Sequence, residues 1–160
     1  MQWLSSTGGP LILLPVSLRQ RWGGALGDAS HYRLACATTG YAGIISLSGS
    51  DLLLLGDEPM DTTVYRDVNG VVLVRWIQGA SREHVESRLT LLLAQPSKEL
   101  ERTRLVVREE CMFLMDSPDA GAEAKGQPVR LTSGTYQVIV EEYRDKDTWL
   151  LFYRLARTAE

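Results

Sequence analysis

The chain has few residues of the kinds that cross-link a protein or bind metal. Its 160 residues include two cysteines and two histidines, so neither a disulfide framework nor a Cys/His zinc motif is expected. Cys36 and Cys111 each lie in an apolar neighbourhood, and we expect both to be buried free thiols. His31 and His84 are isolated and belong to no metal-binding motif. We therefore predict no metal site and no cofactor.

Long apolar runs and a large excess of one charge are also missing. The longest apolar runs, 11–14 and 52–55, are far shorter than the ~20 residues that cross a bilayer. Residues 1–6 lack the pattern of a secretory signal. We therefore expect a cytoplasmic protein with no membrane partner. Seventeen basic and 20 acidic residues give a net charge of -3, which argues against nucleic acid as the partner.

The remaining composition is that of a globular protein. Hydrophobic residues make up 44% of the chain and charged residues 23%, so the chain can bury a sizeable core and is not disordered. No segment repeats at a fixed period. We expect one domain spanning residues 1–160.

Strand signals dominate the segment after Gly40. Four short apolar runs are expected to pair into two hairpins, 44–48 with 52–55 and 62–66 with 71–77. Residues 49–51 would turn the first hairpin. In the second, the Asn69-Gly70 step suits the positive φ angles of a tight turn. Run 71–77 is largely apolar on both faces, which favours an interior strand.

Helical spacing is clearest between Ser81 and Ala94. Ser81 is a good N-cap, an apolar stripe follows, and Pro96 lies just beyond the end. Two shorter helical segments are expected, a turn capped by Ser17 and a segment that opens at residues 28–30 and ends before Gly40.

The C-terminal third returns to a period of two. The pattern predicts a long strand over 105–115 with a charged middle, a loop over 116–126 and a meander of three strands: 129–131, 136–143 and 149–155. Trp76 and Trp149 lie inside strand patterns and are expected in the core. The predicted fold is α+β: mostly antiparallel β-sheet, as one sheet or two packed sheets, with two or three short helices.

No catalytic constellation is recognisable. The chain contains no Gly-x-Ser-x-Gly elbow, no P-loop and no dinucleotide-binding glycine motif, and residues 7–10 are typical of a structural turn. Without a nucleophile and its base we predict no catalytic residues and a protein that is not an enzyme.

Three acids, Asp57, Glu58 and Asp61, follow strand 52–55 directly, where it would leave the core. Three interpretations stay open. Asp57 can cap a turn that Pro59 fixes. The acids can form a ridge that meets a basic partner. Two carboxylates can also act as general acid and base or bind a cation.

Two aromatic residues, Trp22 and Tyr41, stand beside glycine-rich turns. Large aromatic side chains in such positions often anchor protein interfaces. Packing against the core is the alternative for both, and for each residue taken singly the sequence favours packing.

An ordered series of motifs resembles a known family. The motifs of this series are Trp3-Leu4, Gly8 to Pro15, Trp22-Gly23-Gly24, Tyr32 to Cys36, Tyr41-x-Gly43, Leu55 to Pro59 with Thr62, and Val74-Arg75-Trp76. Over the first half of the chain this series is similar to the bacterial immunity protein 21 family, whose members are predicted to protect a cell from a toxin of a polymorphic toxin system.

The resemblance implies a cognate toxin protein as the partner, bound stoichiometrically and without catalysis. Combined with the residues above, it gives an interface that includes Asp57, Glu58 and Asp61, with Trp22 and Tyr41 as anchors. The alternative is a small-molecule-binding or hydrolytic domain with Asp57 and Glu58 at an acidic cleft. A third interpretation, a homodimer formed through an exposed sheet edge, also stays open.

Overall fold

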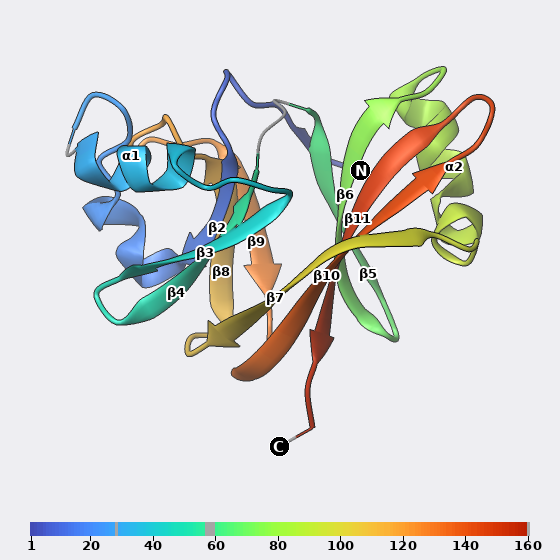
Figure 1. Ribbon diagram of the computed structural model, residues 1–160. Coiled ribbons are helices and arrows are strands. Elements are labelled where there is room, and N and C mark those ends of the chain that lie inside the picture. The colour runs from blue at the N-terminus through green and yellow to red at the C-terminus, as the bar shows by residue number, and fades with distance from the viewer. Residues whose placement is uncertain (28, 57–59, 160) are drawn as a thin grey trace.

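Two antiparallel sheets pack face to face, and helices cover both outer faces (Figure 1). The computed structural model describes residues 1–27, 29–56 and 60–159. The six-stranded sheet has the order β1-β5-β6-β11-β10-β7, and the five-stranded sheet has the order β3-β4-β2-β8-β9. The predicted α+β fold, with two packed sheets, is confirmed.

The six-stranded sheet contains β1 (Trp3–Leu4), β5 (Thr62–Asp67), β6 (Gly70–Gln78), β7 (Lys98–Val107), β10 (Gly134–Arg144) and β11 (Trp149–Arg157). The five-stranded sheet contains β2 (Leu11–Pro15), β3 (Ala42–Leu47), β4 (Ser50–Leu55), β8 (Cys111–Asp116) and β9 (Gly126–Arg130). The helices are the 3-10 helix η1 (Val16–Arg21), α1 (Ala29–Cys36) and α2 (Arg82–Leu93). None of the helices in the described part of the chain is long and apolar enough to span a membrane.

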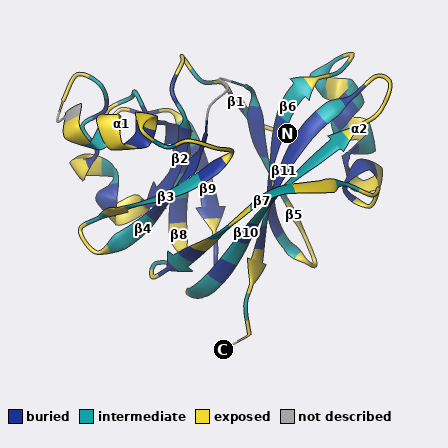
Figure 2. Cartoon of the chain, viewed as in Figure 1, coloured by how far each residue is buried: buried dark blue, intermediate teal, exposed yellow. Residues whose placement is uncertain are grey.

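The uniformly apolar strands are explained by burial on both faces (Figure 2). Leu53 and Leu55 of β4 point into the core between the sheets, whereas Leu52 and Leu54 pack in a second cluster with residues of η1 and α1. On the far side, α2 packs Val85, Leu89, Leu92 and Leu93 against β6 and β11. A strand covered on both faces reads as a continuous apolar run, not as an alternation.

Both predicted hairpins form, and the second turns within residues 67–70, as expected, whereas the first turns one residue earlier than the predicted 49–51. Ser48 and Gly49, with φ of +51° and +78°, connect β3 to β4, as a tight turn with both central residues in the left-handed region requires. In the second hairpin Asp67 pairs with Gly70, so Val68 and Asn69 form the loop. Only Gly70 of the Asn-Gly step has a positive φ.

The predicted strand over 105–115 is wrong, because the chain changes sheets at its charged middle. Strand β7 ends at Val107 in the six-stranded sheet, and β8 begins at Cys111 in the other sheet. Strand β7 also begins early, at Lys98, because an edge strand can present charged side chains to solvent. The predicted meander is likewise incorrect, since β9 pairs with β8 and only β10 and β11 form a hairpin.

The helices agree better with the sequence. Helix α2 begins after Ser81, whose Oγ accepts a hydrogen bond from the His84 amide at 3.1 Å. The segment after Pro15 is the 3-10 helix η1, and Ser17 lies inside it and does not cap it. Trp76 and Trp149, both expected in the core, are half-buried, and Trp76 packs against the cluster beneath α2.

Both cysteines are exposed, contrary to the prediction. Cys36 is the last residue of α1, and its neighbour Ala35 packs in the second cluster, between α1 and the five-stranded sheet. Cys111 opens β8 opposite Arg130, and its neighbour Met112 takes the inward position. Apolar neighbours in sequence therefore do not imply burial, because adjacent residues of a helix or strand face different sides.

One side of the sandwich is sealed by β7. A carboxylate oxygen of Glu101 accepts hydrogen bonds from the backbone amides of Tyr41 (2.6 Å) and Ala42 (3.2 Å). The Val106 amide donates to Asp51 of β4 at 3.0 Å. Hydrogen bonds with a charged acceptor are about twice as strong as neutral ones, so this edge is firmly joined.

A buried carboxylate fixes the N-terminal turn over residues 7–10. Asp116, 2% exposed, accepts hydrogen bonds from the Ser6 hydroxyl, the Thr7 amide and the Thr7 hydroxyl at 2.6–2.9 Å. The expectation that this glycine-rich segment is a structural turn agrees with these contacts.

Replacing Asp116 is expected to destabilise the fold. An Asp116→Ala substitution removes the acceptor of three hydrogen bonds and should lower the free energy of unfolding by about 1–3 kcal/mol, measured by urea denaturation. The control is Asp147→Ala in the exposed β10–β11 turn, which should change stability little. Equal effects of the two substitutions would contradict the assigned role.

The buried phenol of Tyr153 should make the free energy of unfolding depend on pH in the alkaline range. Burial raises its pKa from 10.0 to about 12, and nearby Arg75 opposes this only in part. As the pH rises, the unfolded chain therefore loses this proton before the folded chain does. The contribution of Tyr153 to the free energy of unfolding is fully present below pH 10 and falls by about 1.4 kcal/mol per pH unit up to about pH 12.

The matched test is Tyr153→Phe, followed by urea denaturation across this range. The Tyr153 hydroxyl has no hydrogen-bond partner among the described residues, so the variant should keep its stability at pH 7 and lose less of it as the pH rises. Tyr65→Phe, which changes a hydroxyl beside Thr90, serves as the control. An unchanged alkaline slope in Tyr153→Phe would show that this phenol is not the group responsible.

Candidate functional site

A pocket of about 500 Å³ lies where the two sheets approach each other at the end of β4. We call it the Tyr41 pocket. The residues that line it come from both sheets and their flanking loops: Gly40, Tyr41, Gly56, Met60, Arg75, Ile77, Trp149 and Leu151. A concave, largely apolar surface with a few polar groups is the usual form of a recognition site.

Glycine is required where the two loops beside the pocket meet. A Cβ atom on Gly56 would lie 2.0 Å from the carbonyl oxygen of Gly40, which no side chain tolerates. The Gly56 amide donates to the carbonyl of Tyr41 at 2.8 Å. Gly40 has a φ of +110°, and Glu101 lies against it. The backbone at the rim is therefore fixed by close contact, with Tyr41 held from both sides.

The Arg75 guanidinium forms the polar part of the wall. Arg75 is 1% exposed. It donates to the carbonyls of Gly56 (2.5 Å) and Leu55 (3.2 Å), the last residues before the chain leaves β4. Its guanidinium also lies 5.5 Å from the ring centroid of Tyr153, within cation–π range. A side chain of β6 thus holds the end of β4.

Of the predicted site residues, Tyr41 lies at the pocket and is 43% exposed. Asp57 and Glu58 lie outside the described residues. Their nearest described neighbours in the chain, Gly56 and Met60, both line the pocket.

Asp61 does not line the pocket. Its carboxylate forms an ion pair with Arg82 at the start of α2, with Nε at 3.0 Å from the oxygen, and accepts a hydrogen bond from the Ser5 hydroxyl. The acid therefore has a structural role, in which it joins the loop before β5 to α2.

Trp22 is a core residue and not a surface one. It is 1% exposed, its indole N–H donates to the carbonyl of Ser117 at 2.8 Å, and its ring stacks on His31 at 5.6 Å. Of the two interpretations of Trp22, packing agrees with the structure, and we leave this residue out of the proposed interface.

Arg75 and Trp149 also line the pocket, and neither was expected there from the sequence. A charged residue inside the apolar strand 71–77 was the available signal, because a cation is rarely placed in an interior strand without a specific set of acceptors. Trp149 gave no such signal, since its part in the pocket depends on how β11 and the β3–β4 hairpin meet.

The described lining is suited to binding. It contains one cation and one phenol among apolar and aromatic side chains, and no carboxylate, histidine or cysteine. Nowhere in the described ranges do three His, Cys, Asp or Glu side chains gather as metal ligands. The described groups can therefore hold an apolar or aromatic side chain of a partner.

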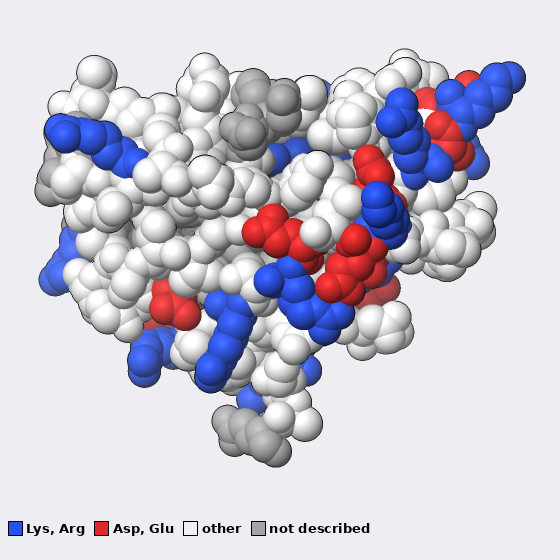
Figure 3. Space-filling view, in the orientation of Figure 1, with Lys and Arg blue, Asp and Glu red and all other residues white. Residues whose placement is uncertain are grey.

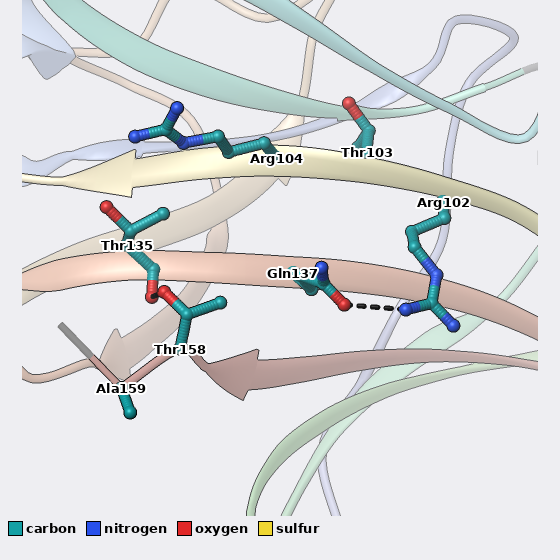
Figure 4. A pocket seen from close by; sticks show the side chains of 7 residues that line it. All are labelled: Arg102, Thr103, Arg104, Thr135, Gln137, Thr158 and Ala159. Atoms are coloured by element: carbon teal, nitrogen blue, oxygen red, sulfur yellow. Dashed lines mark hydrogen bonds between the residues drawn. The ribbon is translucent and has the colours of Figure 1, made fainter.

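A second hollow, of about 530 Å³, lies on the outer face of β7 and β10 (Figure 4). Two of its polar side chains, Arg102 and Gln137, are engaged with each other. Arg102 donates to Gln137 at 2.6 Å and forms an ion pair with Glu99. Among the described residues on this side of the molecule, acidic and basic side chains are interspersed (Figure 3), so they form no patch of one sign around the hollow.

Comparison with known proteins identifies the family. The family model described as Immunity protein 21 matches residues 2–148 of the chain. This range includes all the lining residues of the Tyr41 pocket except Trp149 and Leu151. No curated protein and no solved structure matches the chain. The resemblance seen in the first half is thus confirmed and extends into the second, and the chain belongs to the immunity protein 21 family.

Proposed function

We propose that this protein neutralises a cognate toxin by binding it stoichiometrically, without catalysis, and that the Tyr41 pocket is the centre of the contact surface. The family supports an immunity role in general. The observation that carries the proposed site is the junction of Tyr41, Gly56 and Arg75, which forms a rigid concavity from both sheets.

Rigidity of this junction favours tight binding. Arg75 holds the carbonyls at the end of β4, and Glu101 holds the amides at the start of β3. A surface that is already ordered loses little conformational entropy when its partner binds. Tyr41, an exposed aromatic residue beside a pocket, has the character of a residue that carries much of the binding energy.

The acids Asp57 and Glu58 belong to the proposed contact surface because they follow Gly56 directly in the chain. Carboxylates beside an interface increase the association rate of a basic partner. We propose that they face such a surface of the toxin, while Asp61 contributes through its ion pair with Arg82.

We also propose that the protein works in the cytoplasm. Both of its cysteines are exposed and unpaired, a state that a reducing compartment preserves.

A small-molecule-binding or hydrolytic domain is the second candidate function. Its supporting observation is the size of the Tyr41 pocket, about 500 Å³, which falls within the range of ligand sites. One variant distinguishes the two candidate functions. A pocket used only for a small molecule would lose that ligand in Tyr41→Ala without any change in toxin binding.

Tyr41→Ala is therefore the first test. The substitution should weaken toxin binding by about 30-fold or more, as expected for a residue worth at least about 2 kcal/mol at an interface. The main-chain bonds of Tyr41 remain, so its free energy of unfolding should change little. Leu91→Ala on the exposed face of α2 is the matched control. Calorimetry with the purified toxin domain measures both, and equal affinities of the two variants would place the contact elsewhere.

The acids are tested by charge reversal. A double variant, Asp57→Lys with Glu58→Lys, should associate more slowly with the toxin, and the deficit should shrink as salt is raised because exposed charges are screened. Stopped-flow fluorescence gives the rate constant. The control, Glu123→Lys with Asp147→Lys, makes the same change in net charge at exposed positions. If both double variants slow association equally, net charge and not this surface is responsible.

A further inference from the structure

The side of the sandwich opposite β7 is open. Strand β1 pairs with β5 only at Thr62 and Thr63, so within the described residues the outer edge of β5 from Val64 to Asp67 has no strand beside it. The edge strand of the other sheet on this side is β9. At one end Gln2 bridges the two edges, because its carbonyl accepts from the Thr63 hydroxyl (2.6 Å) and the Gln127 amide (2.8 Å).

Beyond that bridge the two edges border a pair of adjoining cavities, of about 310 and 660 Å³. Arg66 of β5 and Arg130 of β9 line both cavities, and Arg157 of β11 lines the smaller one. We call this region the arginine cleft. It shares no lining residue with the Tyr41 pocket.

The charge of the arginine cleft is not neutralised from within. Arg66 and Arg130 form no hydrogen bond or ion pair with any described residue. Arg157 donates to the carbonyl of Ser133 at 2.9 Å. Asp67 is the acid of the lining, and one of its oxygens is taken by the Asn69 amide at 2.7 Å. Among the described residues that line the two cavities, three guanidinium groups therefore stand beside one carboxylate, with Glu110 close to Tyr136 of the smaller cavity, in a chain whose net charge is -3.

We propose that the arginine cleft binds an extended acidic segment of a protein partner. The main chain of the segment would add to the free edge of β5, and its carboxylates would pair with Arg66 and Arg130. An unpaired edge offers backbone donors and acceptors to a strand, and the planar guanidinium matches a carboxylate with two parallel hydrogen bonds.

Two features favour a peptide over a nucleic acid. The larger cavity is also lined by the exposed Val16 and by the buried Met112 and Val129, an apolar wall that suits the side-chain stems of a peptide better than a phosphate backbone. A polyanion, in contrast, draws its affinity from many phosphate contacts, and the overall negative charge of this chain opposes that mode.

The test uses an acetylated peptide of alternating valine and glutamate, about eight residues long, labelled for fluorescence anisotropy. The full-length protein should bind it, with affinity that falls as salt rises. The double variant Arg66→Ser with Arg130→Ser should bind at least tenfold more weakly. Arg33→Ser with Arg104→Ser, two exposed arginines elsewhere, should bind like the unmodified protein.

Two further probes make the result decisive. The same peptide methylated on alternate backbone nitrogens should bind at least tenfold more weakly, because methylation removes the donors that a strand edge needs. A single-stranded DNA of similar length should bind more weakly than the peptide. Failure of the peptide to bind, equal binding by both double variants, equal binding of the methylated peptide, or preference for DNA each overturns the proposal. None of these results depends on the toxin.

Discussion

The buried guanidinium of Arg75 joins the two sheets of this protein. It extends from an interior strand of one sheet and donates to the carbonyls that end β4 in the other. Removing a cation from water is costly, and only well-placed acceptors offset that cost. Because these acceptors are backbone carbonyls, the interaction fixes the path of the chain at Gly56 and with it one wall of the Tyr41 pocket. The geometry of the candidate site is therefore tied to the packing of the core.

Local signals in the sequence were enough to predict much of the fold. Helix α2 was found because Ser81, the apolar stripe and Pro96 all agree, and the α+β class followed from the number of short strands. The errors arose where partners are distant in the chain. The charged residues between Val107 and Cys111 read as the middle of one strand, yet they mark a change of sheet. Which face of a strand meets the core depends on its neighbours, so Cys111 was placed on the wrong side.

The candidate site was predicted only in part. Tyr41 was found because an aromatic residue beside a glycine-rich turn is a local feature, but the same reasoning selected Trp22, which a neighbouring loop covers. Arg75 and Trp149 reach the pocket from strands far from Tyr41 in sequence. The periodicity of the sequence does not predict that these residues meet, because their proximity depends on the order of the strands in both sheets. The first-half motifs identified the family correctly, and one of them contains Gly56, which makes the close backbone contact with Gly40 at the rim of the pocket.

The close approach of Gly40 and Gly56 fixes the backbone of the pocket independently of the side chains that line it. A side chain on Gly56 would clash with the backbone of the neighbouring loop, and Gly40 has a positive φ that side chains rarely adopt, whereas Tyr41, Met60 and Ile77 contribute side chains to the lining. Under the proposed function, substitutions at the second set of positions would change selectivity for the toxin, while the two glycines would preserve the architecture. One backbone could then support several inhibitor and target pairs.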